Sequence, residues 1–260
     1  MRKYENLSEQ FSNGVQFEKN SLVIHIPHAS TFIGDEYLQS IILNERELVE
    51  EIAWSTDLFC DELFDIGFGK MIVADFSRLV CDVERFMDDD IEPGAKTGNG
   101  FFYTNTQRGK YLRENNADLK KAASVLYEKH QAQLTEVVNE IICSGDLCLI
   151  IDGHSFCNDP VVGNELPDYC IGADSFHTPA SLVESAKQFL ESMGYTVAVN
   201  YPFSGSMVPL SHYRKDKRVS SLMLEVNKRL YLNNEMTSKS SEFTRVKACI
   251  SQLLKSFIER

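Results

Sequence analysis

The chain has 260 residues, of which 43% are hydrophobic and 25% charged, and this is the composition of an ordinary globular protein with a full core. Its formal net charge of −12 opposes binding to nucleic acid or to an anionic membrane surface through the overall field. We therefore expect a small-molecule partner. A substrate that carries a carboxylate would need local cations, either a metal ion or a few arginines.

The N-terminal stretch MRKYENLSEQF is polar and unlike a secretory signal. No apolar run approaches the roughly 18 residues that a membrane span requires. The chain has seven cysteines, which is an odd number. No two of them form a CxxC motif, and most lie in apolar segments. This pattern predicts reduced thiols in a cytoplasmic protein, with no cysteine in a recognisable nucleophile context.

Strand-like runs alternate with helical patterns along the chain. Strands are expected at 21–27, 70–76, 146–152, 195–201 and 221–226, and helices at 44–65, 116–143, 179–193 and 241–258. The alternation predicts one α/β domain over 1–260, with a mainly parallel or mixed sheet and helices on both faces. The segment 87–109 has four glycines and little periodicity, which predicts a long functional loop.

Two histidines follow buried strands. In SLVIHIPHAS the strand ends at Pro27, which has no N–H for a ladder, and His28 comes next. In LCLIIDGHSF a strand is followed by the turn signal Asp152-Gly153 and then by His154. If the two strands are neighbours, the rings meet, and two histidines with a carboxylate and water form a catalytic zinc site. The alternative for each ring is a hydrogen-bonded loop histidine.

The segment WSTDLFCDEL offers three acids as the third ligand: Asp57, Asp61 and Glu62. On one continuous helix from Asn44, Asp57 and Asp61 lie four residues apart and share a face, which could be an ordinary solvated face. A helix that restarts at Ser55-Thr56 would instead put Asp57 in its first turn, near the site.

Further along, an acid sits in an apolar run. In SLMLEVNKRLY, Glu225 is flanked by apolar residues, and such a carboxylate is costly unless it is paired, functional or turned to solvent. We read it as a candidate general base beside a metal-bound water. The alternative is a structural ion pair with Lys228 or Arg229.

Two arginines follow the second strand in DFSRLVCDVERF. A guanidinium fork binds carboxylates in a bidentate manner, so Arg78 and Arg85 are candidate clamps for a substrate carboxylate. The alternative is a structural pair with Asp75 or Asp82.

Six segments in order carry a family resemblance: IPHAS, STDLFCDELF, SRLVCDVERF, IIDGHSF, NYPFSGS and LEVNKRLY. The chain resembles the N-formylglutamate amidohydrolase family over roughly residues 20–235. The resemblance implies hydrolysis of N-formyl-L-glutamate to formate and glutamate, typically in histidine degradation. It also implies a fold like that of zinc carboxypeptidases and phosphorylase/hydrolase proteins, with a metal-bound water.

Carried onto this chain, the resemblance implies a Zn²⁺ ion, or another divalent metal, held by His28, His154 and a carboxylate. Asp57 is the first choice for the carboxylate, with Asp61, Glu62 and Glu36 left open. Glu225 takes the water proton and passes it to the leaving amine. Arg78 or Arg85 holds a substrate carboxylate.

Three further residues are expected to serve the substrate. Asn200 and Ser206, in NYPFSGS, are candidate contacts, and Tyr103 in the long loop is expected to help close the site. This chain has Glu84 where the family often has Asn before the second arginine, and an acid there is expected to weaken binding of glutamate. Three alternatives remain: a zinc carboxypeptidase, another N-acyl amino acid deacylase, or a binding homologue without turnover.

Overall fold

The structure is a computed structural model, and it describes residues 16–158 and 166–258. The polar N-terminal stretch, expected not to be a signal, lies outside the described residues. The chain separates into two compact units. Of the described residues, 16–26, 59–72, 135–158 and 166–258 form the sheet unit, and 27–58 and 73–134 form the loop unit.

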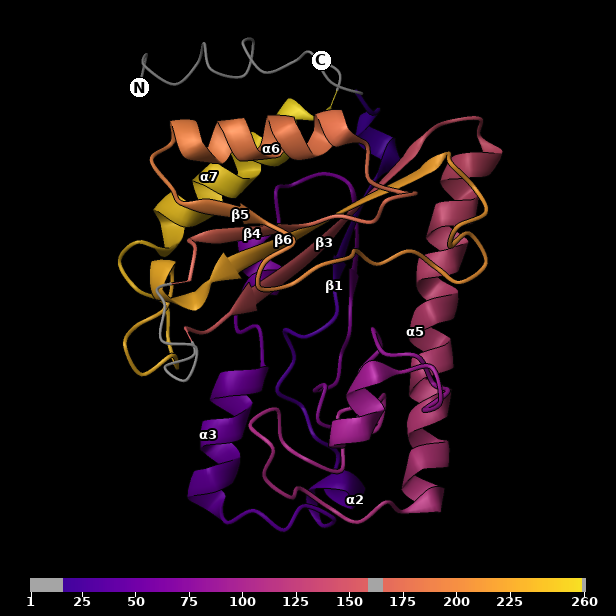
Figure 1. Cartoon of the computed structure of the whole chain (residues 1–260), viewed down its shortest axis with the longest axis vertical. Coiled ribbons are helices and arrows are strands. Elements are labelled where there is room, and N and C mark those ends of the chain that lie inside the picture. The colour runs from indigo at the N-terminus through magenta and orange to yellow at the C-terminus, as the bar shows by residue number, and fades with distance from the viewer. Residues whose placement is uncertain (1–15, 159–165, 259–260) are drawn as a thin grey trace. The chain divides into compact units, whose positions relative to one another are not determined.

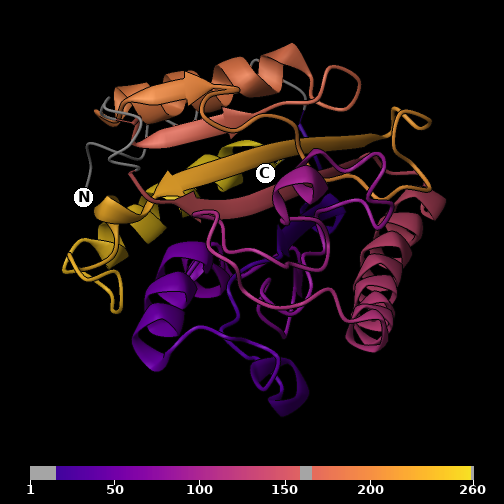
Figure 2. The same ribbon diagram turned by 60° about the horizontal axis from the view of Figure 1, so that its bottom comes forward.

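A six-stranded sheet forms the centre of the sheet unit (Figure 1), with the strand order β2-β1-β3-β6-β4-β5. The strands are β1 (Leu22–Ile26), β2 (Lys70–Val73), β3 (Cys148–Phe156), β4 (Tyr169–Gly172), β5 (Val197–Val199) and β6 (Val219–Asn227). β3 runs parallel to both β1 and β6, β4 is antiparallel to β6, and β4 is parallel to β5. Figure 2 shows β3 and β6 side by side along their lengths. This confirms the predicted mainly parallel α/β sheet.

Several strand bounds differ from the prediction, and two differences matter most for the site and the sheet. β3 does not turn at Asp152-Gly153 but continues to Phe156, so His154 lies inside the strand. Gly153 fits there because a Cβ atom would lie only 2.7 Å from the Ile26 side chain and 3.0 Å from that of Phe64, so the glycine serves close packing, not a turn. β4 was not predicted, because its four residues are too short for a periodicity to register.

Three helices lie wholly within the sheet unit. They are α4 (Cys60–Leu63), α6 (Ala180–Ser192) and α7 (Phe243–Ser256), with the short 3-10 turns η1 (Lys19–Ser21) and η3 (Lys228–Leu230). α6 contacts β4 and β5, α4 contacts β3, and both contact α7. The buried face of α7, which includes Val246, Ile250 and Leu254, supplies the apolar surface that these contacts remove from water.

The loop unit contains α2 (Asp35–Leu38), α3 (Glu45–Ser55), the 3-10 turn η2 (Pro93–Thr97) and the first part of α5 (Ala117–Cys143). Long irregular segments link these elements, including most of the predicted loop 87–109. Its core holds Phe76, Val80 and Phe101 in one apolar cluster and Leu79 with Leu112 in another. The loops are therefore anchored by buried aromatic and aliphatic side chains.

The single helix predicted over 44–65 is wrong. α3 begins with a capping box, in which Asn44 Oδ1 accepts from Glu47 N and the Glu47 carboxylate accepts from Asn44 N. It ends at Ser55, and Phe59 has a φ of 63°, so the chain turns before α4 begins at Cys60. Asp57 therefore lies in the link between two helices and does not share a helical face with Asp61.

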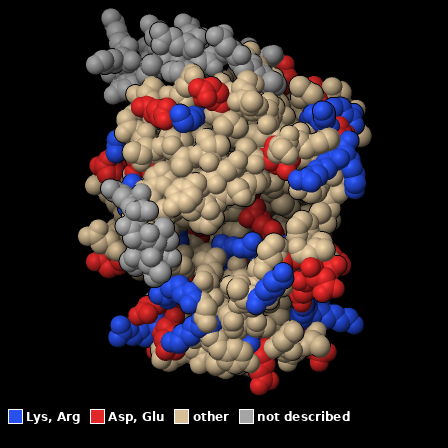
Figure 3. All heavy atoms as spheres, in the orientation of Figure 1, with Lys and Arg blue, Asp and Glu red and all other residues tan. Residues whose placement is uncertain are grey.

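On the face drawn in Figure 3, acidic and basic side chains occur in mixed groups. Ion pairs within the described residues include Arg46 with Glu50 and Arg218 with Asp216. None of the described helices is long and apolar enough to span a bilayer.

Candidate active site

A row of polar side chains crosses one face of the sheet. His25 on β1 pairs in register with Asp152 on β3, and His154 on β3 pairs with Glu225 on β6. Residues two apart on a strand, and residues paired across parallel strands, share a face, so these four side chains point the same way. They are 0–7% exposed. The sheet unit thus concentrates two imidazoles and two carboxylates in a buried row.

Asp152 is the centre of this row. Its Oδ1 lies 2.9 Å from His25 Nδ1 and 3.2 Å from His154 Nε2, and its Oδ2 accepts a 2.9 Å hydrogen bond from the backbone of Met207. Burial disfavours its charged form, but His154 and His25 outweigh burial and hold the pKa of Asp152 well below the ordinary 3.8. The carboxylate is therefore ionised and accepts hydrogen bonds only.

The segment that contains Met207 also carries two predicted substrate contacts. Ser206 Oγ is hydrogen-bonded to Ser221 Oγ on β6, and Ser221 Oγ donates to Met207 O at 2.7 Å. Asn200 has a φ of 55°, and its Oδ1 accepts from Ala173 N at 2.8 Å. Both side chains hold this segment against the sheet, so their contact with a substrate stays a prediction.

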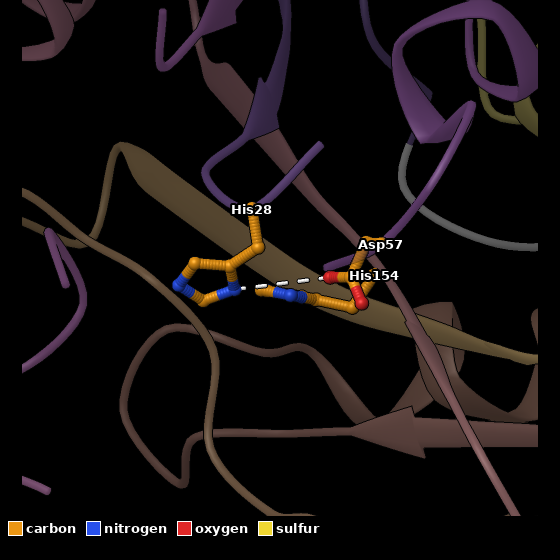
Figure 4. A group of neighbouring side chains, drawn as sticks. All are labelled: His28, Asp57 and His154. Carbon is orange, nitrogen blue, oxygen red and sulfur yellow. Dashed lines mark ion pairs between the residues drawn. The ribbon is translucent and has the colours of Figure 1, made fainter. Parts of the chain in front are cut away.

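His28 and Asp57 come together in the loop unit. His28 Nδ1 lies 3.7 Å from Asp57 Oδ2, the ion pair drawn in Figure 4, and Asp57 N donates to His28 O at 2.8 Å. Both residues are 2% exposed. Figure 4 also labels His154, which comes from β3. His28 and Asp57 belong to the loop unit and His154 to the sheet unit, so an ion shared by all three stays a prediction.

The other acids considered as third ligands are placed differently from Asp57. Asp61 and Glu62 lie on α4 with exposed side chains, and Glu62 pairs with Lys239. Glu36 is exposed on α2. Among these four acids, burial beside His28 favours Asp57.

Asp82 is a fully buried carboxylate on which several donors of the loop unit converge. Oδ1 accepts from His28 Nε2 at 2.9 Å and from Glu84 N at 3.1 Å. Oδ2 accepts from Arg78 Nη2 at 2.7 Å and from Tyr103 Oη at 2.8 Å. Burial opposes its ionisation, but Arg78 and His28 outweigh burial and keep the pKa of Asp82 well below 3.8.

The two candidate arginine clamps differ in availability. The Arg78 side chain is 12% exposed and donates to Asp82 through both Nε and Nη2, which is the structural pair considered from the sequence. The Arg85 side chain is 37% exposed, and its contacts with Asp82 and Glu92 are both 3.7 Å long. Arg85 is therefore the arginine with more capacity to bind a further carboxylate.

Two other predicted groups also have defined places. Tyr103 is fully buried, with its hydroxyl on Asp82. Glu225 is 7% exposed, and Arg229, considered as its structural partner, forms its ion pair with Asp168 at 2.8 Å.

Sequence reasoning missed His25 and Asp152 as site residues and assigned Asp82 only to the arginines. Asp152 and His154 are two residues apart, so a strand that continued to Phe156 would have placed both on one face. Reading Asp152-Gly153 as a turn concealed this. Nothing local signals that Asp82 contacts His28, because 54 residues separate them.

Comparison with known proteins identifies the family of this chain. The sequence profile described as N-formylglutamate amidohydrolase matches residues 20–232. The chain belongs to the N-formylglutamate amidohydrolase family. Family members are hydrolases that act on amide bonds, and the matched span includes every candidate site residue named above.

Relatives of this family are distant in sequence and close in fold. The N-formylglutamate deformylase of Pseudomonas putida is 22% identical over 219 residues, which cover 81% of each chain. The crystal structure of N-formylglutamate amidohydrolase from Ralstonia eutropha JMP134 superposes with a TM-score of 0.76 at 21% identity, over 94% of this chain and 93% of that one. A protein of Agrobacterium tumefaciens gives a TM-score of 0.66 at 19% identity, over 95% and 97% of the two chains.

Proposed function

We propose that this chain is a metal-dependent amidohydrolase that removes the acyl group from an N-acyl amino acid, with N-formyl-L-glutamate as the first substrate to test. The family match and the deformylase name of the Pseudomonas putida relative support the substrate. The observation that carries the proposal is the buried pair of His154 and Glu225, directly opposite each other on neighbouring strands. This arrangement sets a candidate base beside a candidate ligand.

The residues present fit a divalent cation. Two ligand atoms of one tetrahedral Zn²⁺ lie about 3.3 Å apart, given bond lengths of about 2.0–2.1 Å. His28 Nδ1 and Asp57 Oδ2 are 3.7 Å apart, so a small adjustment brings both onto one ion. Two imidazoles and one carboxylate form a three-ligand set that leaves a position open for catalysis. We propose Zn²⁺ as the ion, with Asp57 as the carboxylate.

Chain connectivity supports adding His154 to this set. β1 ends at Ile26, and His28 follows two residues later, which spans at most about 7 Å of chain. β1 and β3 are neighbours, with His25 beside Asp152, two residues before His154. The backbone that carries His28 is therefore tethered to the strand next to the one that carries His154.

In this proposal Glu225 accepts a proton from the attacking water as its oxygen bonds to the acyl carbon. Glu225 then returns that proton to the amino nitrogen as the C–N bond breaks, giving a carboxylic acid and a free amino group. Bound zinc would polarise the acyl carbonyl and lower the pKa of water. Arg85 binds a substrate carboxylate through its partly exposed side chain. Asn200, Ser206 and Tyr103 shape the surroundings through the hydrogen bonds described above.

The test combines metal analysis of the purified protein with release of formate from N-formyl amino acids. Glu225→Gln is expected to lower kcat by about 100-fold or more while the bound zinc is unchanged. The matched control is Glu242→Gln, an exposed acid of the same unit whose substitution should leave activity unaltered. Full activity of Glu225→Gln with zinc bound would remove the residue from the base role. Ligand binding that is insensitive to chelators, without hydrolysis, would favour the binding homologue.

Glu84 favours a second candidate substrate class. Its Oε2 lies 3.8 Å from His28 Nδ1, so an acid stands beside the candidate metal ligand and next in sequence to Arg85. A negative charge there opposes a second substrate carboxylate such as the glutamate side chain. We therefore include N-formyl amino acids with neutral and cationic side chains, and short peptides to test for carboxypeptidase activity. Faster hydrolysis of neutral or cationic substrates by the wild type, reversed in Glu84→Gln, would select the deacylase of another amino acid.

A further inference from the structure

Arg113 is a buried cation of the loop unit that the proposed function does not use. Its side chain is 0% exposed. Nη2 donates to Leu79 O at 2.7 Å, and the guanidinium carbon lies 5.2 Å from the centre of the Phe102 ring. Burial lowers the pKa of Arg113 to about 10, which still leaves the side chain positively charged at neutral pH.

Most of the donors of this guanidinium have no acceptor. A guanidinium has five N–H bonds, and Nε and Nη1 carry three of them. Neither atom has a hydrogen-bond partner among the described residues. Within 16–158 and 166–258, Arg113 also forms no ion pair. A buried charge without a counter-ion strongly destabilises a fold, so this position favours an anion.

Tyr37 supplies a further donor in the same core. It is 3% exposed, and its hydroxyl likewise has no hydrogen-bond partner among the described residues. Tyr37 belongs to one buried apolar cluster with Phe102, and the charges of Tyr37 and Arg113 influence each other. Burial raises the pKa of Tyr37 to about 12, so at neutral pH the phenol keeps its proton and is not the counter-ion of Arg113.

The buried acids of the loop unit do not neutralise Arg113 either. Each of them contacts other groups: Glu51 accepts from Gln107 N, Asp57 pairs with His28, Asp82 pairs with Arg78, and Glu92 accepts from Gly94 N. Compensation of the Arg113 charge therefore requires an anion that is not one of these carboxylates.

We infer that Arg113 and Tyr37 form a binding site for a small monovalent anion, such as a halide, nitrate or formate, in the core of the loop unit. Three N–H bonds and one O–H bond are available to hold it. Full burial favours an anion of few atoms, and a single guanidinium is neutralised by a single negative charge. The inference does not rest on the proposed function, because neither residue has a role in it.

The test is thermal unfolding of the full-length protein at constant ionic strength, with sodium gluconate replaced stepwise by bromide, nitrate or formate. Arg113→Met keeps a side chain of similar length without the charge, so it reports the general effect of each salt. The melting temperature of the wild type relative to Arg113→Met should rise by about 3–5 °C for each tenfold increase in anion concentration above the dissociation constant. Arg46→Met, which removes an exposed arginine of the same unit, should follow the wild type.

Tyr37→Phe tests the second donor. Loss of a hydrogen bond to a charged ligand should move the stabilisation to anion concentrations about tenfold or more higher. The anion that acts at the lowest concentration identifies the preferred ligand, and a preference for any of the three supports the site. An equal response of the wild type and Arg113→Met would overturn the inference, because an anion held by a bound metal or by the surface would act on both.

If Arg113→Met does not fold, crystals of the wild type grown in sodium bromide decide. Anomalous scattering from bromide within hydrogen-bonding distance of Arg113 Nε or Nη1 is the expected result. Ordered water on both atoms with no bromide would overturn the site. Zinc content and formate release do not enter these measurements, so failure of the proposed function leaves this outcome unchanged.

Discussion

Gly172 leaves no room for a Cβ atom, and its replacement by alanine tests the packing of the segment that contains Gly205 and Met207. A Cβ atom at Gly172 would lie 2.4 Å from Gly205 O and 2.2 Å from Met223 Cε. The methionine end can rotate, but the carbonyl oxygen is backbone. It must withdraw by about 0.6 Å to reach 3.0 Å, the distance below which real Cβ contacts essentially never occur.

Gly172→Ala is expected to lower both the free energy of unfolding and the catalytic activity. Overpacking of this kind destabilises a folded protein by about 1–3 kcal/mol, and we expect the upper half of that range because backbone must move. With a urea m value of about 2–3 kcal/mol/M, the unfolding midpoint should fall by about 1 M. The shift also moves the backbone near Met207, whose N–H holds Asp152, so kcat/KM should fall as well.

The assay is urea unfolding followed by circular dichroism, with hydrolysis of the best N-formyl substrate measured in parallel. Gly34→Ala is the control, because its Cβ would meet only the Tyr37 ring at the ordinary distance of 3.9 Å. A Gly172→Ala protein that unfolds at the wild-type urea concentration would refute the reasoning.

Three further variants probe single interactions. Asn44→Ala should cost about 0.5–2 kcal/mol in urea unfolding, because it removes the capping box of α3, and an unchanged midpoint would contradict that role. Tyr103→Phe should cost about 1.5–3 kcal/mol, because it deletes a buried hydrogen bond to ionised Asp82 and keeps the ring. Glu51→Gln tests a pH effect: burial raises the pKa of Glu51 above 4.5, so this carboxyl stabilises the fold below that pH and its contribution is lost as pH rises through the folded-state pKa. Melting temperatures of the wild type relative to Glu51→Gln should fall with rising pH, and a relative rise would contradict the sign.

Most of the sheet could be predicted from the sequence because its strands contain runs of apolar residues and are separated by clear helical patterns. The hydrophobic pattern gave a wrong prediction where one helical pattern continues across a break in the chain. Glu45–Ser55 and Cys60–Leu63 carry helical residues across a break, and the break depends on a left-handed Phe59, which no periodicity reports. β4 was missed because its four residues gain their strand conformation from pairing with β6.

Some residues of the candidate site could likewise be predicted from the sequence, and others could not. His28, His154 and Glu225 stand out in the sequence because burying a polar residue in or beside an apolar strand costs free energy. Such a residue can be recognised from its own short segment, without knowledge of the fold. Asp82 and Asp152 do not stand out in the sequence, because the role of a carboxylate depends on which hydrogen-bond donors contact it in the folded chain. Asp82 reads as the partner of Arg78 four residues earlier, and that pair is present, but it uses one oxygen. The other oxygen meets His28, which only the folded chain brings near. Candidate ligands can thus be found from sequence, whereas the carboxylates that contact them can be found only from the tertiary structure.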